Sequence, residues 1–297
     1  MNEALRVLVG PTGAGKTALL LALADDLPIE VLSLDSVQVY RGLDIGSAKP
    51  TRAERARLPH HLVDLVEPDA RFTAADWLAA CERAIAEVRS RDRVPIVAGG
   101  TGLYLRLLTT GLAPLPPADD ALRARLLAEE EAAPGALHAR LTAIDPASAA
   151  RIAPRDRVRL VRALEVAERS GRPLSQHLAA HAAARADRPL RVVYLDPPDD
   201  ALCAALERRT EAMMRAGLVD EARGLRARFG PVRALDALGY KEALELVDGR
   251  FHPSELGARI VAASRQFARR QRTWFGKAPG ALRVVDAAAA RAALSRS

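Results

Sequence analysis

The chain has 297 residues, of which 49% are hydrophobic; this suits a globular protein with a buried core and excludes a disordered chain. No apolar run reaches membrane-spanning length, and an apolar segment starts by Leu5, so we expect no membrane partner and no signal peptide. The two cysteines, Cys81 and Cys203, argue against a disulfide framework and favour a cytoplasmic location.

The net charge of +7 favours a polyanionic partner such as nucleic acid. An arginine-rich proteome would give the same balance. Of the 44 basic residues only four are lysines, Lys16, Lys49, Lys241 and Lys277. A lysine retained in such a chain suggests that its position needs a compact ammonium. Lys16 is the strongest case, and the roles of Lys49 and Lys241 stay open.

The first strand-turn-helix, residues 5–23, contains a phosphate-binding loop. An apolar strand leads into a glycine-rich turn, and an Ala/Leu-rich helix follows. The turn fits the pattern of a glycine, four residues and Gly-Lys-Thr without a mismatch. Its backbone N–H groups and the helix N-terminus attract an anion, Lys16 adds a cation, and the Thr17 hydroxyl can bind Mg²⁺. We predict that polyphosphate is bound by Gly10, Pro11, Thr12, Gly13, Ala14, Gly15, Lys16 and Thr17.

Two further predicted strands end in polar residues. Residues 28–34 lead into Asp35, and residues 93–98 lead into Gly99, Gly100 and Thr101. The carboxyl ends of parallel strands face the ligand crevice of an open α/β sheet. Asp35 can take up a proton there, although a simple turn aspartate is an alternative. Three strand ends are therefore expected to converge on one crevice.

The segment between these strands offers no clear metal site. Residues 41–51 form a polar, glycine-bearing loop. His60 and His61 have no Cys, His or Glu partner at ligand spacing, so zinc is not expected. Whether the histidine pair touches a substrate is left open. Farther on, Thr73 and Asp76 predict the start of a helix with a capping box.

Prolines at 114, 116 and 117 mark a break, and residues 119–187 have a helical pattern without a strand-like run. This segment reads as an all-helical insertion into the α/β core. Arg155, Arg159 and Arg162 fall on one predicted helical face with few acidic partners. A solvated charged face and a nucleic-acid contact are both open explanations. A second arginine-rich helix, residues 264–275, interleaves aromatic residues and suits an RNA surface.

Several separate blocks, in order, resemble the tRNA dimethylallyltransferase family over nearly the whole chain. Only the phosphate-binding loop is widely shared with kinases and ATPases. The departures are small, with Gly13-Ala14, Ser47 and Ala98 replacing common family residues. The matching blocks are Gly10–Thr17, Asp35-Ser36-x-Gln38-x-Tyr40, Asp44–Thr51, His60-His61-x-x-Asp64, Gly99–Tyr104, Arg162–Val166, Gly239–Glu242 and Arg269-x-Gln271-x-Thr273-Trp274-Phe275.

The resemblance implies a phosphate-loop α/β core, residues 1–113 and 190–297, and a helical insertion, residues 114–189, that contacts tRNA. It implies transfer of a dimethylallyl group from its diphosphate to N6 of the adenosine at position 37 of tRNA, with Mg²⁺ as cofactor. Asp35 would be the general base, Thr101 would bond near the reacting centre, and Arg209 would contact the diphosphate. The implied tRNA contacts are Asp35, Ser36, Val37, Gln38, Thr101, Arg123, Val158, Arg159, Leu160, Val161 and Arg162.

Two rival functions share part of this pattern. A nucleoside or small-metabolite kinase would have the same loop and core, but it predicts ATP consumption and a lid over the phosphates. A non-catalytic RNA-binding protein could keep the loop as a nucleotide switch, but it would leave Asp35 and Thr101 without a role. We expect a monomer that binds tRNA and dimethylallyl diphosphate.

Overall fold

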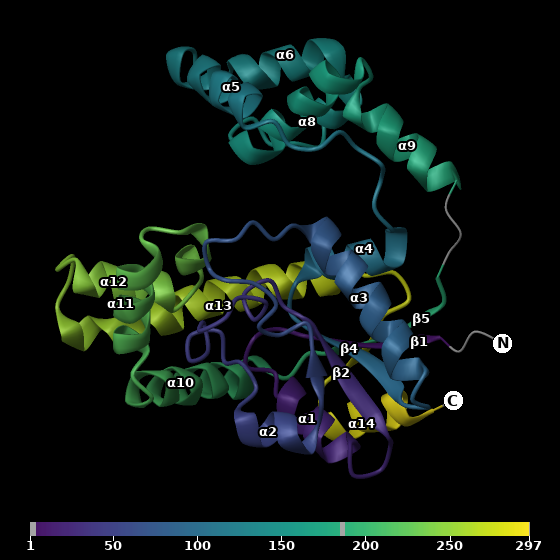
Figure 1. Ribbon diagram of the computed structural model, residues 1–297, viewed down its shortest axis with the longest axis vertical. Helices are drawn as coiled ribbons and strands as arrows, with labels where there is room; N and C mark the ends of the chain where they lie inside the picture. The colour runs from purple at the N-terminus through teal and green to yellow at the C-terminus, as the bar shows by residue number, and fades with distance from the viewer. Residues whose placement is uncertain (1–3, 185–187, 297) are drawn as a thin grey trace. The chain divides into compact units, whose positions relative to one another are not determined.

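The computed structural model describes residues 4–184 and 188–296. The chain divides into two compact units, one of residues 1–109 and 188–297 and one of residues 110–187. The first unit is built on a six-stranded sheet (Figure 1). Its strands are β1 (Leu5–Val9), β2 (Ile29–Leu34), β3 (His60–His61), β4 (Val94–Gly99), β5 (Leu190–Leu195) and β6 (Leu282–Val284).

All neighbouring strands are parallel, in the order β3-β2-β4-β1-β5-β6. β1 and β2 are buried along their whole length, as expected for a sheet covered on both faces. Successive side chains alternate between the two faces, so Val7 packs in one core cluster and Leu8 in the other. The strand order reverses between β1 and β4, which is where such sheets bind ligands.

Helices cover both faces of the sheet. α3 and α4 cover one face, where Trp77 stacks on Tyr104 with ring centroids 4.2 Å apart. α1 and α14 cover the other face through leucines and alanines. The helices packed around the sheet are α1 (Lys16–Leu23), α2 (Arg52–Arg57), α3 (Ala74–Arg89), α4 (Gly102–Thr110) and α14 (Ala287–Ser295).

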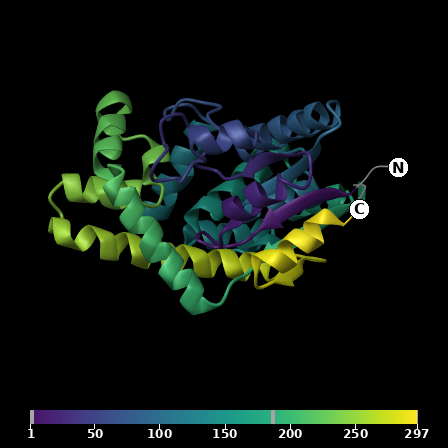
Figure 2. The ribbon, with the colours of Figure 1, turned by 90° about the horizontal axis from the view of Figure 1, so that it is seen from below.

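A group of C-terminal helices extends the first unit beside the sheet. α10 packs against α13, as the views in Figures 1 and 2 both show. α11 and α12 bury a further apolar cluster around Tyr240 and Leu43. The elements are α10 (Asp199–Arg215), α11 (Leu218–Phe229), η1 (Arg233–Asp236), α12 (Tyr240–Val247), η2 (Pro253–Glu255) and α13 (Leu256–Phe275).

The second unit contains only helices among its described residues. Its core is made by leucines of α5, α6 and α8, including Leu126, Leu141 and Leu160. The helices are α5 (Asp120–Ala132), α6 (Ala136–Ile144), α7 (Pro146–Ala149), α8 (Arg157–Ser170) and α9 (Leu174–Ala184). We refer to this unit as the helical unit.

The predicted fold class, a parallel α/β sheet with an all-helical insertion, is confirmed. The predicted capping box at Thr73 and Asp76 is also present. The prediction that Arg155 shares a helical face with Arg159 is wrong. The Asp156 side chain accepts from the Arg159 N–H and caps α8, so Arg155 lies in the turn before the helix.

Candidate active site

The phosphate-binding loop leaves the start of α1 open to an anion. Gly13 and Gly15 have φ of +83° and +86°, values that glycine adopts without strain. α1 begins at Lys16 with no side-chain cap and no acidic residue in its first turn. Unpaired N–H groups at a helix start carry partial positive charge. The loop is therefore prepared for a negatively charged ligand.

Two cations border this loop without a carboxylate partner. The Lys16 ammonium donates to the carbonyls of Gly10 and Pro11, at 2.8 and 2.9 Å. Burial and the nearby charge of Arg209 lower the pKa of Lys16 to about 8, against the opposing influence of Asp35. Burial likewise lowers the pKa of Arg209. Within the described residues, neither cation has a carboxylate at ion-pair distance, so their charge is available to a ligand.

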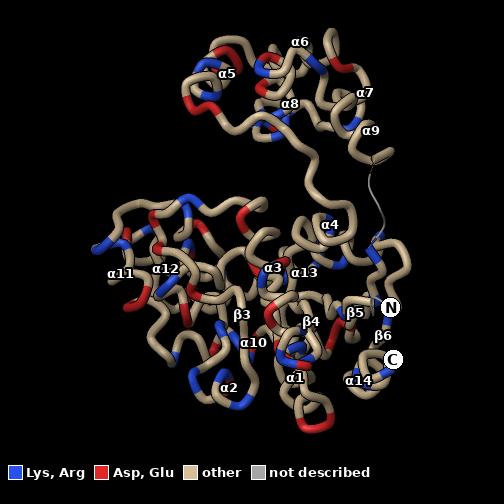
Figure 3. Tube along the Cα trace, turned by 45° about the vertical axis from the view of Figure 1, so that its right-hand side comes forward, with Lys and Arg blue, Asp and Glu red and all other residues tan. Residues whose placement is uncertain are grey.

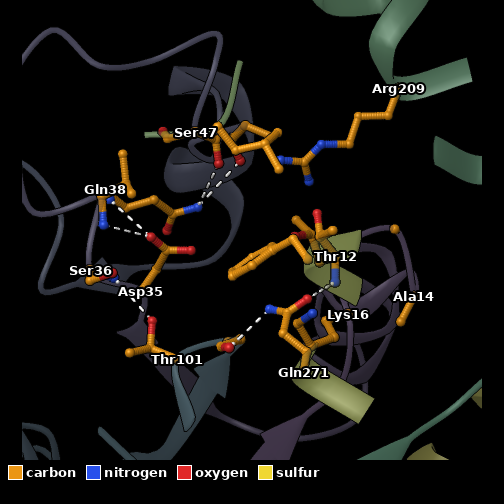
Figure 4. Close-up of a pocket in the computed structure, with 18 of the residues that line it drawn as sticks. Thr12, Ala14, Lys16, Asp35, Ser36, Gln38, Ser47, Thr101, Arg209 and Gln271 are labelled. Atoms are coloured by element: carbon orange, nitrogen blue, oxygen red, sulfur yellow. Dashed lines mark hydrogen bonds between the residues drawn. The ribbon is translucent and has the colours of Figure 1, made fainter. Parts of the chain in front are cut away.

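Asp35 and Thr101 lie across the pocket from these cations (Figure 4). The Asp35 carboxylate accepts from the N–H of Val37 at 2.7 Å and of Gln38 at 3.2 Å, both through Oδ1. The Thr101 hydroxyl oxygen accepts from the N–H of Ser36 at 3.2 Å. Among the described residues, the hydroxyl hydrogen of Thr101 and Oδ2 of Asp35 have no hydrogen-bond partner, so both can meet a ligand.

One cavity of about 750 Å³ joins the two sides. It is formed wholly within the first unit, by the phosphate-binding loop, the ends of β2 and β4, and residues of α10 and α13. His60 and Lys241, whose roles the sequence left open, both line it. The predicted convergence of three strand ends on one crevice is found in the structure.

Gln38 is bound within the protein. Its amide oxygen accepts from the Ser33 hydroxyl at 2.8 Å, and its nitrogen donates to the carbonyls of Ser47 and Ala48 at 3.4 and 3.3 Å. The side chain thus holds the wall of the pocket at residues 47–48. This arrangement supports a positioning role for Gln38 more directly than the tRNA contact that the resemblance implies.

Lys49 lies outside the cavity and is structural. Its side chain is 1% exposed and pairs with Asp44 and Asp64, each at 2.6 Å. The same loop is held from α11, because the Glu221 carboxylate accepts from the N–H of Ile45 at 2.9 Å and from the Tyr240 hydroxyl. A buried ammonium needs such partners, which explains why this position keeps a lysine.

Sequence analysis assigned no role to Gln271, although the residue stands in one of the matching blocks. Its amide oxygen accepts from the Thr12 N–H at 2.8 Å, and its nitrogen donates to the Gly100 carbonyl at 2.9 Å. A polar residue on the buried face of α13, in line with Ala268 and Phe275, is the signal that could have identified it.

The arginines of the helical unit have more acidic partners than predicted. Glu165 is fully buried and accepts from Arg123 at 2.8 Å and from Arg162 at 2.5 Å. Arg159 is 65% exposed and lies 3.4 Å from Asp156. Figure 3 shows both acidic and basic residues on these helices. The expectation of sparse acidic partners is wrong, because Glu165, which follows Arg162 by one helical turn, neutralises two arginines.

Not all the predicted tRNA contacts of α8 are accessible. Leu160 and Val161 are 0% and 6% exposed and lie in the core of the helical unit. Their side chains are therefore unavailable to a ligand, since an amphipathic helix turns its apolar face inward. Val158, in contrast, is 76% exposed.

The basic helix α13 is also partly neutralised. Arg265 pairs with Glu207 at 2.7 Å, and Arg272 pairs with Asp196 at 2.7 Å. Arg270 lines the cavity. α13 therefore combines structural ion pairs with residues that line the cavity.

Comparison with known proteins decides the family. The family model described as IPP transferase matches residues 38–278. A protein of Anaeromyxobacter sp. (strain Fw109-5) named tRNA dimethylallyltransferase is 50% identical over 94% of this chain and 93% of its own. The chain belongs to the IPP transferase family. Relatives in this family are named tRNA dimethylallyltransferase, an enzyme that transfers a prenyl group to tRNA. The kinase alternative is therefore not favoured.

Solved structures agree with this assignment. The full-length tRNA isopentenylpyrophosphate transferase of Bacillus halodurans has 36% identity and a TM-score of 0.69, over 96% of this chain and 90% of its own. A eukaryotic dimethylallyltransferase acting on tRNA has 23% identity and a TM-score of 0.80, over 97% of this chain and 75% of its own. The second likeness shows the shared fold. No helix in the described ranges is both long and apolar enough to cross a membrane.

Proposed function

We propose that this IPP transferase moves a dimethylallyl group from dimethylallyl diphosphate to N6 of adenosine 37 in tRNA, beside the anticodon, and releases diphosphate. One observation carries the proposal: a single cavity has Asp35 and Thr101 on one side, and on the other an open helix start and two cations that no carboxylate of the described residues pairs with. Relatives named tRNA dimethylallyltransferase supply the substrate classes. The proposed site of action is the cytoplasm.

The phosphate-binding loop would hold the diphosphate of the donor. Its N–H groups, with Lys16 and Arg209, would stabilise the negative charge that grows as diphosphate leaves. Donors fixed in advance at such a position give a large part of a rate enhancement. The lowered pKa of Lys16, about 8, would rise again when the anion binds beside it.

The residues present fit Mg²⁺ as cofactor. Mg²⁺ prefers oxygen ligands and is often held by one or two protein groups together with phosphate oxygens and water. Thr17 offers an exposed hydroxyl in the first turn of α1. In the described ranges, no three His, Cys, Asp or Glu residues gather as a metal site, which agrees with a metal held mainly by the substrate. When bound, Mg²⁺ would neutralise charge on the leaving diphosphate.

Asp35 would accept the proton from N6. The C1–O bond of the donor breaks, the diphosphate keeps the electron pair, and the N6–C1 bond forms. The fixed Oδ1 of Asp35, which accepts from Val37 N–H, leaves Oδ2 to take the proton. Thr101 would donate a hydrogen bond from its hydroxyl group to the acceptor adenine, since its oxygen already accepts from the Ser36 N–H.

The acceptor adenine must leave its stack to enter the cavity. RNA phosphates would be held by arginines of the helical unit, with Arg159 the most exposed of the three predicted contacts and Arg123 and Arg162 oriented by Glu165. The backbone around Ser36 and Val37 lines the cavity and would border the base.

The test is to incubate the protein with dimethylallyl diphosphate, Mg²⁺ and unmodified tRNA, and to analyse the nucleosides by mass spectrometry. We expect N6-isopentenyladenosine at position 37. Absence of this product together with robust ATP turnover would contradict the proposal.

Asp35→Asn is the first variant to examine. The amide keeps the shape of the side chain but cannot act as a base, so turnover should fall by about 10²–10⁴-fold while tRNA binding is retained. Single-turnover kinetics and a filter-binding assay measure the two quantities. Unchanged turnover would remove Asp35 as the base.

A further inference from the structure

One buried side chain joins two neighbouring loops that line the cavity, one after β1 and one after β4. Gln271 is 5% exposed and comes from α13, near the end of the chain. Its oxygen accepts from the Thr12 N–H at 2.8 Å, and its nitrogen donates to the Gly100 carbonyl at 2.9 Å (Figure 4). Both ends of one amide are thus used, one on the phosphate-binding loop and one on the loop that leads to Thr101.

The contacts of Gln271 extend to Asp35, on the side of the pocket proposed to bind the acceptor adenine. Gly100 precedes Thr101, whose hydroxyl oxygen accepts from the Ser36 N–H at 3.2 Å, and Ser36 follows Asp35. At Gly100, a Cβ would lie 2.2 Å from the Gln271 nitrogen, so the loop approaches the amide as closely as a glycine allows. A continuous series of covalent and hydrogen bonds therefore runs from the phosphate-binding loop to Asp35.

The chemistry of the position requires an amide. Thr12 supplies a donor and Gly100 an acceptor, and only an uncharged side chain with one of each pairs with both. An apolar residue would leave the two backbone groups unpaired, which is costly at a buried site. A carboxylate would lose the bond to Gly100 and would place negative charge beside the predicted diphosphate.

We propose that Gln271 is a positioning residue that fixes the distance between the phosphate-binding loop and the Thr101–Asp35 side of the cavity. The inference rests on the proposed function. Transfer requires the reacting atoms to meet at roughly 3–3.5 Å, and a displacement of about 1 Å can cost about 100-fold in rate. Gln271 acts through the two loops, since both ends of its amide bond to their backbone.

Gln271→Met tests the proposal, since methionine keeps the length of the side chain and removes both bonds. We expect affinity for inorganic diphosphate to fall about tenfold, and the single-turnover rate at saturating substrates to fall about 100-fold, the loss that misplacement by about 1 Å causes. Ser264→Ala is the matched control: it removes a buried polar group seven residues earlier on α13, outside the cavity lining. It should change both quantities less than twofold. A Gln271→Met protein that differs from wild type only in melting temperature would overturn the proposal.

Gln271→Glu adds a signature that a purely structural role would not give. A protonated carboxyl group pairs with Thr12 and Gly100 as the amide does, whereas the ionised form cannot donate to Gly100. The single-turnover rate of the variant relative to wild type should therefore rise as pH falls, by up to about tenfold per unit above the pKa of the new carboxyl group. A ratio that stays flat between pH 5 and 8 would contradict the proposal.

The two proposals fail in different ways. If wild type forms no prenylated adenosine, the proposed function is wrong, and the rate experiments with variants have no meaning. Diphosphate affinity still decides whether Gln271 holds the phosphate-binding loop, because that measurement needs no turnover.

Discussion

The pocket and the helical unit use basic side chains in opposite ways. Lys16 and Arg209 border the cavity without a carboxylate at ion-pair distance among the described residues, and burial lowers the pKa of each. Arg123 and Arg162 of the helical unit share the fully buried carboxylate of Glu165. Residues of the same charge are therefore left unneutralised in one region and neutralised in the other.

This difference distinguishes cations that can bind a ligand from cations that stabilise the fold. Burying a cation that has no charged partner costs free energy, and a bound anion offsets that cost. A cation on a buried carboxylate contributes to the fold and has less charge to offer. For Glu165, burial favours the protonated form, but hydrogen bonds from Arg123, the Asp119 N–H and Arg162 outweigh it and lower the pKa to about 2. Net charge alone thus overstates the surface available to RNA.

Among the basic residues, the largest effect is expected at Lys16. Lys16→Met removes the ammonium and should lower turnover by about 10³-fold, comparable with the loss of one preorganised donor at a charged transition state. Thermal stability should not fall, because the variant removes a cation that burial disfavours. Steady-state kinetics and a melting curve measure both. A loss of turnover matched by a loss of folded protein would contradict the assignment of Lys16 to ligand binding.

Glu165→Gln should act on the helical unit in the opposite way. It leaves Arg123 and Arg162 without their buried countercharge, which costs about 3 kcal/mol of unfolding free energy. Affinity of the pocket for diphosphate should be unchanged. Glu168→Gln is the matched control, because Glu168 also pairs with two arginines but is 25% exposed; it should cost below about 1 kcal/mol. Equal costs in urea unfolding would show that burial of Glu165 is unimportant.

The pocket should show a pH dependence that comes from Lys16. Its pKa in the free protein is about 8, and a bound anion raises it, so binding takes up a proton above that pH. Affinity for a diphosphate monoester, whose terminal group ionises near roughly pH 6, should decrease as pH rises through 8, by up to about tenfold per unit. Calorimetry measures it. The same slope in Lys16→Met would exclude Lys16 as its source.

The smallest effect is expected at Arg159, the most exposed of the three predicted phosphate contacts. Arg159→Ala should weaken tRNA binding a few-fold and reduce the slope of log affinity against log salt by about 0.7, the value for one single-stranded phosphate contact. Stability should hardly change, since the pair with Asp156 is exposed and 3.4 Å long. An unchanged slope would remove Arg159 from the RNA surface.

The sequence predicted the parts of the site that depend on local pattern. The phosphate-binding loop, Asp35 and Thr101 all follow strands whose apolar runs are easy to recognise, and parallel strands bring their carboxyl ends together. The cavity between them therefore followed from periodicity and turn chemistry.

Contacts between distant segments could not be predicted in this way. Gln271 meets Thr12 across 259 positions of the chain, and Glu165 reaches Arg123 from another helix. A pattern of i, i+4 spacing reports which residues share a face, but not whether a buried carboxylate lies beneath them. That is why the arginines of α8 looked unpaired, and why Leu160 and Val161 were assigned to RNA although they lie in the core.

We propose that the phosphate-binding loop holds the leaving group of a prenyl transfer and needs no nucleotide. The most direct test is to measure diphosphate released and prenylated adenosine formed in one reaction of wild type with dimethylallyl diphosphate, Mg²⁺ and unmodified tRNA, with ATP left out. We expect one diphosphate for each modified adenosine and no release when tRNA is omitted. A requirement for ATP, or orthophosphate as the released product, would contradict it.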